Sequence, residues 1–496
     1  MTNLRNYQRF AVEKFRNAPD RSNLLVSPTG SGKTVIATAI MQEYARDLKS
    51  VLFIVHRREI VNQTSDKLHD LGIAHGIIMA GKTPRLLERV QVAAVQTLHA
   101  RAIRSNRIDL PDADLLIFDE AHHAPAKTYQ AIIDRYPNAK ILGLTATPCR
   151  GDGRGLGGVF DALIELPQVP DLIDLGHLVK TRTYAPVPPD LKGIRTVAGD
   201  YAQNQLAERV NTDRLVGDIV THWLKYGERR KTVAFAADVA HSIHIRDQFI
   251  AAGVRAEHID GTTPKEERDE TLARLGRGEI DVVSNCMVLT EGWDCPEVGC
   301  CILARPTKQL GLYRQMIGRV LRPAPGKTDA IILDHSGAYR RLGFAEDRVE
   351  WTLDPDEGAV NRTQAKRDRN GDRFIDCVEC GALREGGKPC PHCGYLPQPR
   401  ARAHEVEQGE LGLVDRNRQV QPPTYDPETR REWHGMFIYI GQERGYKPGW
   451  AAMNYSKKFG EWPPRHLPPP LPVAPSAEVR SWVRSQMIAY AKSRAA

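Results

Sequence analysis

Near the start of the chain, an apolar run leads directly into a glycine-rich loop and then into a helix, and this succession limits the possible folds most strongly. Residues 23–26 read NLLV, residues 27–34 read SPTGSGKT, and VIATAI follows. Small residues let successive backbone amides wrap a chain of phosphates at a helix N-terminus. The strict pattern has glycine where Ser27 stands, which is one departure. The sequence therefore predicts a nucleoside-triphosphate loop within an α/β fold.

The loop and a pair of acids supply the first candidate site residues. Lys33 is expected to reach the β- and γ-phosphates, and the Thr34 hydroxyl to bind Mg²⁺. Asp119 and Glu120 end the apolar run LLIF and are expected beside the loop, because ligands gather at the carboxyl ends of parallel strands. Asp119 would hold Mg²⁺ through water, and Glu120 would deprotonate the attacking water. The loop residues expected to contact the nucleotide are Thr29, Gly30, Ser31, Gly32, Lys33 and Thr34.

Strand-like apolar runs alternate with helical patterns through the first 340 residues, as in parallel α/β sheets; the first series reads NLLVS, SVLFIV, RVQVAAV, DLLIFDE and KILGLTAT. A second series begins near Lys231, after a stretch containing PQVPDL and APVPPDL, and reads KTVAFAA, IDVVSN, GCCILAR and DAIILDH. The predicted order is a first ATP-binding domain (1–170), a connector (171–205), a second domain (206–350), a linker (351–373), a four-cysteine module (374–397), a linker (398–429), an aromatic basic helical module (430–464), and a proline-rich spacer with a terminal helix (465–496).

Five short segments, together with Gln8 in the N-terminal LRNYQRF, resemble the motifs of superfamily 2 helicases and nucleic-acid translocases. The phosphate loop, DEAH at 119–122 and TATP at 145–148 resemble motifs I, II and III. In the second series, VLTEGWD at 288–294 resembles motif V and QMIGRVLR at 315–322 resembles motif VI. The resemblance implies two tandem RecA-like domains, with adenine read by Gln8 near Arg5. It also implies that Gly292 and Asp294 contribute to the nucleotide site.

Motif VI contributes Gln315, Arg319 and Arg322 as catalytic candidates. An arginine supplied across an interface stabilises the charge on a transferring phosphoryl group, which raises the rate by roughly 10³ to 10⁵. Arg319 and Arg322 stand three apart on an expected helix and would share a face, and Gln315 lies one turn earlier. Because Lys33 lies in the first domain, hydrolysis is expected to require the two domains to close, so that ATP turnover becomes interdomain motion.

Candidate nucleic-acid contacts lie in segments that resemble motifs Ia, Ib and V and in a matching turn of the second domain. They are His56, Arg57, Gln96, Thr97, Gly261, Thr262 and Thr290. Family members mostly contact the sugar-phosphate backbone there, and such contacts give salt-dependent, largely sequence-independent binding. For any one of these residues, a helix cap or a surface turn is an equal alternative.

Two CxxC pairs, Cys377 with Cys380 and Cys390 with Cys393, are each followed by glycine. Four thiolates on tight turns suit tetrahedral, structural Zn²⁺, whereas a redox pair or ligation by His392 are the alternatives. An ATPase core followed by such a module resembles bacterial DNA-repair helicases of the RadD type, as does the LRNYQ start. The tail is shorter than in that type, so no protein partner is predicted from it.

The positive charge is concentrated at the end of the chain. Of the formal net charge of +8, residues 430–496 carry +7, from 11 Lys and Arg against four Glu. Eight aromatic residues lie between Trp433 and Trp462. A basic tail with interleaved rings makes nucleic acid a candidate partner, and the alternative is a small helical core with a basic surface.

Together these patterns predict an ATP- and Mg²⁺-dependent DNA helicase or translocase with a Zn²⁺ module, acting in DNA repair or recombination. DNA is favoured over RNA. The alternatives are an RNA helicase and a nucleotide-gated nucleic-acid clamp that does not unwind. No apolar run approaches the roughly 18 to 20 residues of a membrane helix, and the two CxxC pairs among nine cysteines fit a reducing compartment. We therefore expect a cytoplasmic protein with no membrane partner.

Overall fold

The computed structural model describes residues 4–186, 188–290, 292–354, 374–396, 425–464 and 466–495. They fall into two compact units, Met1–Pro399 and Arg400–Ala496. Most of the two predicted linkers, 351–373 and 398–429, lies outside the described residues. Among the described helices, none is long and apolar enough to cross a membrane.

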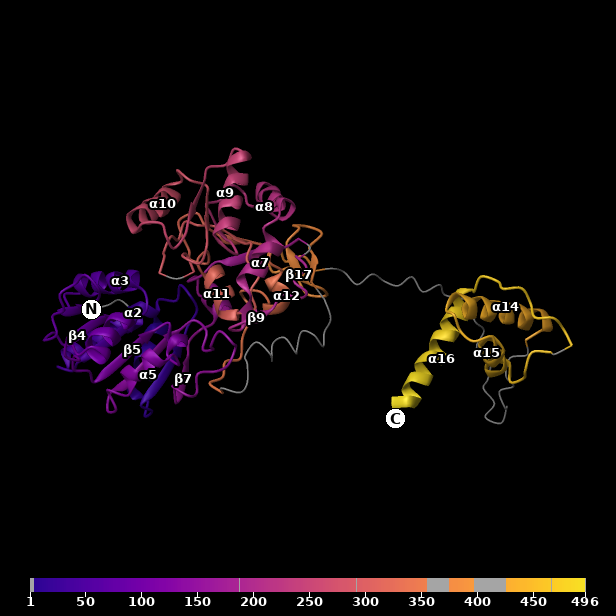
Figure 1. Ribbon diagram of the computed structural model, residues 1–496, viewed down its shortest axis with the longest axis horizontal. Coiled ribbons are helices and arrows are strands. Elements are labelled where there is room, and N and C mark those ends of the chain that lie inside the picture. The colour runs from indigo at the N-terminus through magenta and orange to yellow at the C-terminus, as the bar shows by residue number, and fades with distance from the viewer. Residues whose placement is uncertain are drawn as a thin grey trace. The chain divides into compact units, whose positions relative to one another are not determined.

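A parallel sheet forms the first lobe of the larger unit, drawn in indigo and purple in Figure 1. It has seven strands, in the order β3-β4-β2-β5-β6-β1-β7. Alternate residues of its central strands enter two separate hydrophobic clusters. Leu25 and Phe53 join one cluster, and Leu24 and Leu52 join the other. Both faces are therefore buried, which explains the continuous apolar runs. The strands are β1 (Ser22–Val26), β2 (Val51–Val55), β3 (His75–Ile78), β4 (Val90–Ala94), β5 (Leu115–Asp119), β6 (Lys140–Thr145) and β7 (Ala162–Glu165).

Helices cover both faces of this sheet. One face is covered by α1 (Asn6–Asn17), α2 (Lys33–Arg46), α3 (Arg58–Asp70) and α6 (Val169–Asp174). The other is covered by α4 (Val95–Leu98), a π-helical turn (His99–Arg104), a 3₁₀ turn (Ala121–His123) and α5 (Lys127–Ile133).

A six-stranded parallel sheet forms the second lobe, in the order β12-β13-β11-β14-β15-β8. Its strands are β8 (Lys180–Tyr184), β11 (Thr232–Phe235), β12 (Ala256–Ile259), β13 (Val282–Asn285), β14 (Cys300–Leu303) and β15 (Asp329–Asp334). Its helices are α7 (Gln203–Val210), α8 (Asp213–Tyr226), α9 (Val239–Ala251), α10 (Lys265–Arg277), α11 (Leu310–Gly318) and α12 (Ala338–Leu342). One hydrophobic cluster contains both Ile36 of the first lobe and Ile317 of the second, so the lobes pack together. The predicted pair of tandem parallel-sheet domains is confirmed.

The segment 171–205 does more than connect the two lobes, which was its only predicted role. Its β8 adds to the second sheet by pairing with β15, and a short antiparallel hairpin follows, β9 (Thr196–Val197) with β10 (Asp200–Tyr201). The strand KTRTY is rich in polar side chains, so no apolar run marks it.

Two small elements complete the chain. The four-cysteine module contains an antiparallel pair, β16 (Phe374–Asp376) with β17 (Leu383–Glu385). The second unit contains α14 (Pro427–Glu443), α15 (Gly449–Phe459) and α16 (Ala477–Ala495). The helical module was expected to begin at residue 430. In the structure α14 begins at Pro427, inside the expected linker 398–429, and Asp426 caps it. Val479 and Val483 of α16 enter the same core as Trp433, so the terminal helix belongs to the module at 430–464.

Candidate active site

The phosphate loop joins β1 to α2 and has the backbone that a phosphate cradle needs. Gly30 and Gly32 both have φ of 87°, a left-handed conformation that favours glycine. The Lys33 ammonium donates to the carbonyls of Ser27 (3.1 Å) and Pro28 (3.4 Å), inside the loop. Among the described residues, the buried hydroxyls of Ser27 and Ser31 have no hydrogen-bond partner. These groups fit the phosphates of a nucleotide, because anions at a helix N-terminus satisfy such donors.

The N-terminal segment is fastened to this loop by two side chains. Gln8 Nε2 donates to the Ser31 carbonyl (3.0 Å), and Tyr7 Oη donates to the same oxygen (2.6 Å). Arg5 donates to Tyr7 Oη (3.1 Å), and its backbone N–H donates to Gln8 Oε1 (3.0 Å). A Cβ at Gly32 would lie 2.5 Å from Gln8 Nε2, so this contact also requires glycine. The sequence assigned no role to Tyr7, whose only signal was its position beside Gln8.

The two acids lie at the end of β5, which is separated in the sheet by β6 from β1, the strand that leads into the loop. Asp119 ends β5, and Glu120 has φ of 48° and ψ of 56°, which is strained for a residue with a side chain. Both are 8% exposed, and Glu120 Oε2 lies 3.4 Å from His122 Nδ1. Burial lowers the pKa of Lys33, whereas the nearby Glu120 and Asp119 carboxylates oppose that shift. Lys33 and both acids therefore form one electrostatic group.

The second lobe brings Arg322 onto the phosphate loop. A Cβ at Gly30 would lie 3.4 Å from Arg322 Cγ, and a Cβ at Gly318 would lie 2.6 Å from Thr29. Arg322 forms an ion pair with Asp294, so Asp294 reaches the loop region through this arginine. The predicted nucleotide-site residues Thr29, Gly30 and Asp294 are thus brought together with Arg322.

Arg319 has a different setting. Its guanidinium donates to the carbonyls of Thr290 (2.7 Å) and Trp293 (2.8 Å), within its own lobe. The helix α11 ends at Gly318, so Arg319 and Arg322 do not share a helical face as expected. The prediction of a shared face assumed that the 3.6-residue repeat of the helix continues to Arg322, but the helix ends at Gly318. Arg319 holds the motif V segment through these two carbonyls, and the charges of both Arg319 and Arg322 act on Lys33 of the phosphate loop, where they help to lower its pKa.

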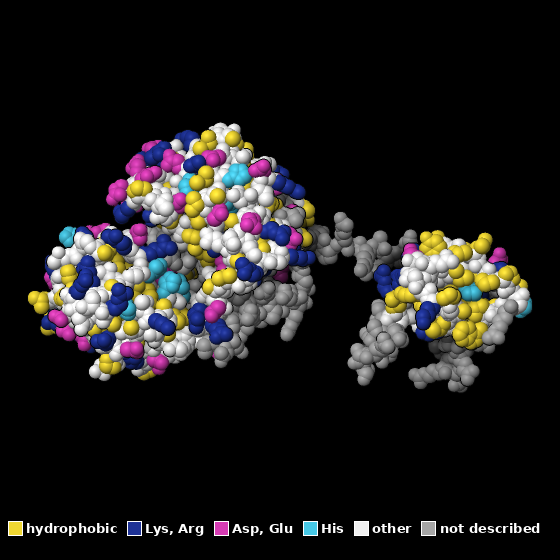
Figure 2. Space-filling view, in the orientation of Figure 1, with side chains coloured by type: hydrophobic (Ala, Val, Ile, Leu, Met, Phe, Trp, Pro, Cys, Tyr) yellow, Lys and Arg dark blue, Asp and Glu magenta, His cyan; other side chains and the backbone are white. Residues whose placement is uncertain are grey.

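A cavity of about 650 Å³ lies between the lobes. It gathers Gln315, Thr290, His56, Arg57 and His122. The His123 ring lies 4.5 Å from that of His56 and 4.1 Å from that of His122, and Figure 2 shows histidine side chains on the surface where the lobes meet. The other charged residues that line the cavity are Arg150, Asp152, Lys308 and Arg341. The charged residues of the lining are therefore mostly cationic.

Other predicted contacts lie outside this cavity. Gln96 is exposed and Thr97 half-buried on α4, whereas Gly261 and Thr262 are exposed after β12. Thr34, the second residue of α2, is half-buried.

Two groups of the motif V segment form hydrogen bonds with nearby residues. Thr290 Oγ1 donates to the Met287 carbonyl (3.1 Å), and the Gly292 carbonyl accepts from Gln63 of α3 (2.9 Å). Gly292 therefore lies at the contact between lobes rather than on the phosphate loop.

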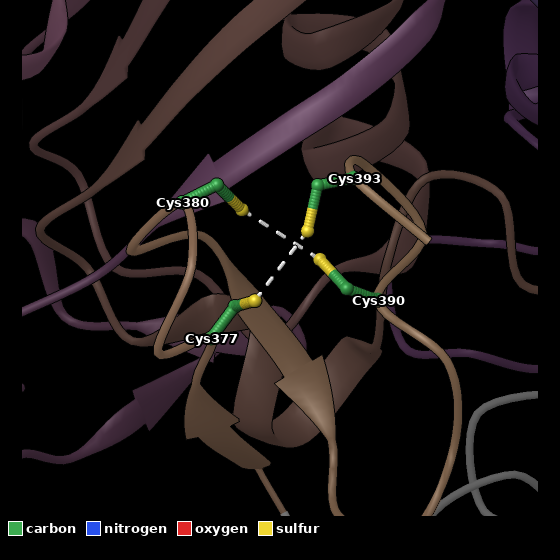
Figure 3. Close-up of side chains that lie close together, drawn as sticks. All are labelled: Cys377, Cys380, Cys390 and Cys393. Atoms are coloured by element: carbon green, nitrogen blue, oxygen red, sulfur yellow. Dashed lines mark hydrogen bonds between the residues drawn. The ribbon is translucent and has the colours of Figure 1, made fainter. Parts of the chain in front are cut away.

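The four cysteines of the module converge on one point (Figure 3). Their sulfurs lie within 4.8 Å of one another, with Cys377 3.6 Å from Cys393 and Cys380 3.7 Å from Cys390. Four sulfurs placed tetrahedrally at about 2.3 Å from Zn²⁺ stand about 3.8 Å apart. The donor set and its spacing therefore fit zinc.

Comparison with known proteins agrees with this arrangement. Residues 1–150 match the family "Type III restriction enzyme, res subunit", and residues 215–324 match "Helicase conserved C-terminal domain". A 51.5 kDa protein of Lactococcus phage (isolate 7-9) is 32% identical, over 80% of this chain and 83% of its own length. The HsdR fragment of a type I restriction enzyme from Vibrio vulnificus shares the fold, with a TM-score of 0.52 at 21% identity over 69% of this chain and 67% of its own.

Two cellular relatives extend the comparison. IRC3 of Saccharomyces cerevisiae, assigned as an ATP-dependent helicase, is 31% identical over 70% of this chain and 55% of its own length. The DNA 3'-5' translocase XPB2 of Sulfurisphaera tokodaii is 25% identical, over 64% of this chain and 78% of its own. This chain thus spans little more than half of the yeast relative. With the phosphate loop, the paired acids and the motif VI arginine in place, the chain belongs to the ATP-hydrolysing superfamily 2 helicases.

Proposed function

We propose that this protein is a DNA helicase or translocase that couples Mg²⁺-ATP hydrolysis to movement along DNA. The observation that carries the proposal is the cationic cavity between the lobes, because it joins candidate nucleic-acid residues to Gln315 and His122 of the ATPase motifs. Closure of the lobes on ATP would then change the grip of Arg57 and Thr290 on a strand. The resemblance to RadD-type proteins supports a role in DNA repair or recombination.

The ATPase residues divide into four roles. Lys33 and the loop amides bind the phosphates, while Thr34 and Asp119 would hold Mg²⁺, which neutralises charge on the transferring group. Glu120 accepts the proton of the attacking water. Arg322 stabilises the charge that develops on the phosphoryl group, and Arg319 holds motif V in shape. Gln8 and Arg5 would read adenine.

Steady-state ATPase with single-stranded DNA, duplex DNA and RNA as separate activators tests this function. Stimulation by DNA supports the proposal, and the name of XPB2 favours that outcome. Stimulation by RNA alone would favour an RNA helicase. Binding without stimulated turnover would favour a nucleotide-gated clamp.

Zinc is the metal proposed for the cysteine cluster. The purified protein is expected to hold one Zn²⁺ per chain, because four thiolates leave no coordination position open. Cys377→Ser should lose the zinc and lower the midpoint of thermal unfolding, since metal binding and folding of such modules are coupled. Cys286→Ser, at a buried cysteine outside the cluster, is the matched control and should keep the zinc. A full zinc content in Cys377→Ser would contradict the assignment.

The C-terminal unit is proposed to add affinity for DNA rather than catalysis. Some of its cations are engaged internally: Lys458 lies 4.4 Å from the centre of the Trp433 ring, and Arg480 pairs with Glu443. Arg431, Lys447, Lys457 and Arg484 carry the remaining positive charge that this proposal uses. The truncation that tests this removes the chain from Tyr425 onward, because α14 begins at Pro427 with Asp426 as its cap and a later stop would divide this helix.

Deleting residues 425–496 should leave ATPase nearly normal at saturating DNA but raise the DNA concentration needed for half-stimulation. The dependence of log affinity on log salt should become shallower by about 0.7 to 0.9 for each phosphate that the unit neutralises in the full chain. Replacing Arg431, Lys447 and Lys457 with alanine in the full chain should act in the same direction. An unchanged salt slope in both proteins would show that the unit does not touch nucleic acid.

A further inference from the structure

The cysteine module is packed into the second lobe. Ala382 is 1% exposed and belongs to the hydrophobic cluster that fills one face of the second sheet. A Cβ at Gly381 would lie 3.9 Å from the rings of Tyr184 and Tyr226, which stack at 4.6 Å. His392 Nε2 lies 3.8 Å from Asp329 on β15. The module is therefore a built-in part of this lobe rather than a tethered reader of nucleic acid.

Phe374, the first residue of β16, connects the module to the part of the second lobe that packs against motif VI. Its ring meets two rings edge to face, that of Tyr339 at 5.5 Å and that of Phe344 at 5.1 Å between centroids. Tyr339 lies on α12 and is 2% exposed. Edge-to-face pairs fix relative orientation as well as adding stability. The module thus holds the segment that runs from α12 through Phe344.

That segment in turn holds the helix of motif VI. Tyr313 Oη on α11 donates to the Gly343 carbonyl at 2.7 Å, in a buried setting. Arg314 donates to the Asp347 carbonyl at 2.6 Å. Ala345, between these two points, lies in the same core cluster as Ile317. Two hydrogen bonds and shared apolar packing therefore position α11 against the segment 343–347.

We propose that Phe374 and Tyr313 are positioning residues for ATP hydrolysis, through which the cysteine module sets the orientation of α11. This inference rests on the proposed zinc site and on the proposed role of Arg322. The helix carries Gln315 and ends just before Arg319 and Arg322. The phosphate loop and Gln8 belong to the first lobe and take no part in the ring contacts of Phe374, so removing this ring should change ATP binding less than turnover.

The expected signature is a lower kcat at nearly constant KM for ATP. A displacement of about 1 Å in a group that acts in the transition state costs up to about 10²-fold in rate. We expect Phe374→Ala in the full chain to lower kcat about tenfold, with KM for ATP and affinity for DNA within about twofold of the parent. Its zinc content, measured by metal release with a chelating dye, should remain one per chain.

Matched variants separate positioning from a general loss of stability. Ile375→Ala is the control on the same strand, since Ile375 is 45% exposed, and it should leave kcat unchanged. Phe374→Tyr keeps the ring and should restore kcat. Tyr313→Phe removes only the hydrogen bond to Gly343 and leaves the module intact, so it should lower kcat in a protein that keeps its zinc.

The double variant of Phe374→Ala and Tyr313→Phe should have a kcat little below that of the worse single variant, because both residues lie on one path. Three outcomes overturn the proposal: a parental kcat in Phe374→Ala, a parental kcat in Tyr313→Phe, or fully additive effects in the double variant. If Phe374→Ala loses its zinc, its kcat no longer tests the proposal, and the kcat of Tyr313→Phe decides whether the proposal holds. A parent protein without ATPase would instead contradict the proposed function.

Discussion

Replacing Arg322 with alanine is expected to lower kcat for ATP hydrolysis by about 10³-fold or more while the protein remains folded. Arg322 comes from the second lobe and lies against Gly30 of the phosphate loop. Its charge is held there by Asp294. Because such an arginine stabilises the transition state, nucleotide binding should change far less than turnover. Single-turnover hydrolysis and equilibrium titration with a fluorescent ATP analogue measure the two effects separately.

Three comparisons make this result specific. Arg348→Ala, at an exposed arginine paired with Asp171, should keep the parental rate. Arg322→Lys should recover little, because an ammonium does not reproduce the planar fork of a guanidinium. Arg319→Ala should mainly lower the midpoint of thermal unfolding, since two buried carbonyls lose their donor at a cost of about 1–3 kcal/mol each. A normal rate in Arg322→Ala would remove this residue from the active site.

The strands that the sequence predicts and the strands that it misses differ in one physical respect. The apolar runs identified β1, β2, β4, β5 and β6 of the first sheet and β11, β13, β14 and β15 of the second. The missed strands, β3, β7, β8 and β12, are the four edge strands of the two sheets. Each of these strands carries at least one polar or charged side chain (HGII, ALIE, KTRTY and AEHI), which edge strands tolerate, so a search for continuous apolar runs passes over them.

The candidate site shows the same division between local and distant information. The phosphate loop and the two CxxC pairs are local patterns, and the structure places their residues together as the spacing indicated. The contacts of Arg319 with Thr290 and of Phe374 with Tyr339 join segments about 30 residues apart, and no spacing rule predicts them. The roles of the seven nucleic-acid candidates stay predictions, and only His56, Arg57 and Thr290 of them line the cavity between the lobes.

Glu120→Gln is expected to abolish turnover while ATP binding persists. A general base contributes about 10² to 10⁴ in rate, and an amide cannot accept the proton of the attacking water. Glutamine has nearly the same size as glutamate, so the change does not by itself relieve the strained backbone at φ of 48°. Lys33→Ala is the contrasting variant and should weaken nucleotide binding, since its ammonium lies inside the loop that holds the phosphates.

The two variants should also differ in how ATP affects the grip on DNA. If hydrolysis resets the lobes, Glu120→Gln remains closed on ATP and should dissociate from single-stranded DNA more slowly with ATP present than the parent does. Lys33→Ala should show no such effect, because it does not reach the ATP-bound state. Dissociation rates of labelled DNA, measured with and without ATP, test this difference. Near-normal turnover in Glu120→Gln would show that another group accepts the proton, and equal dissociation rates would separate ATP binding from lobe closure.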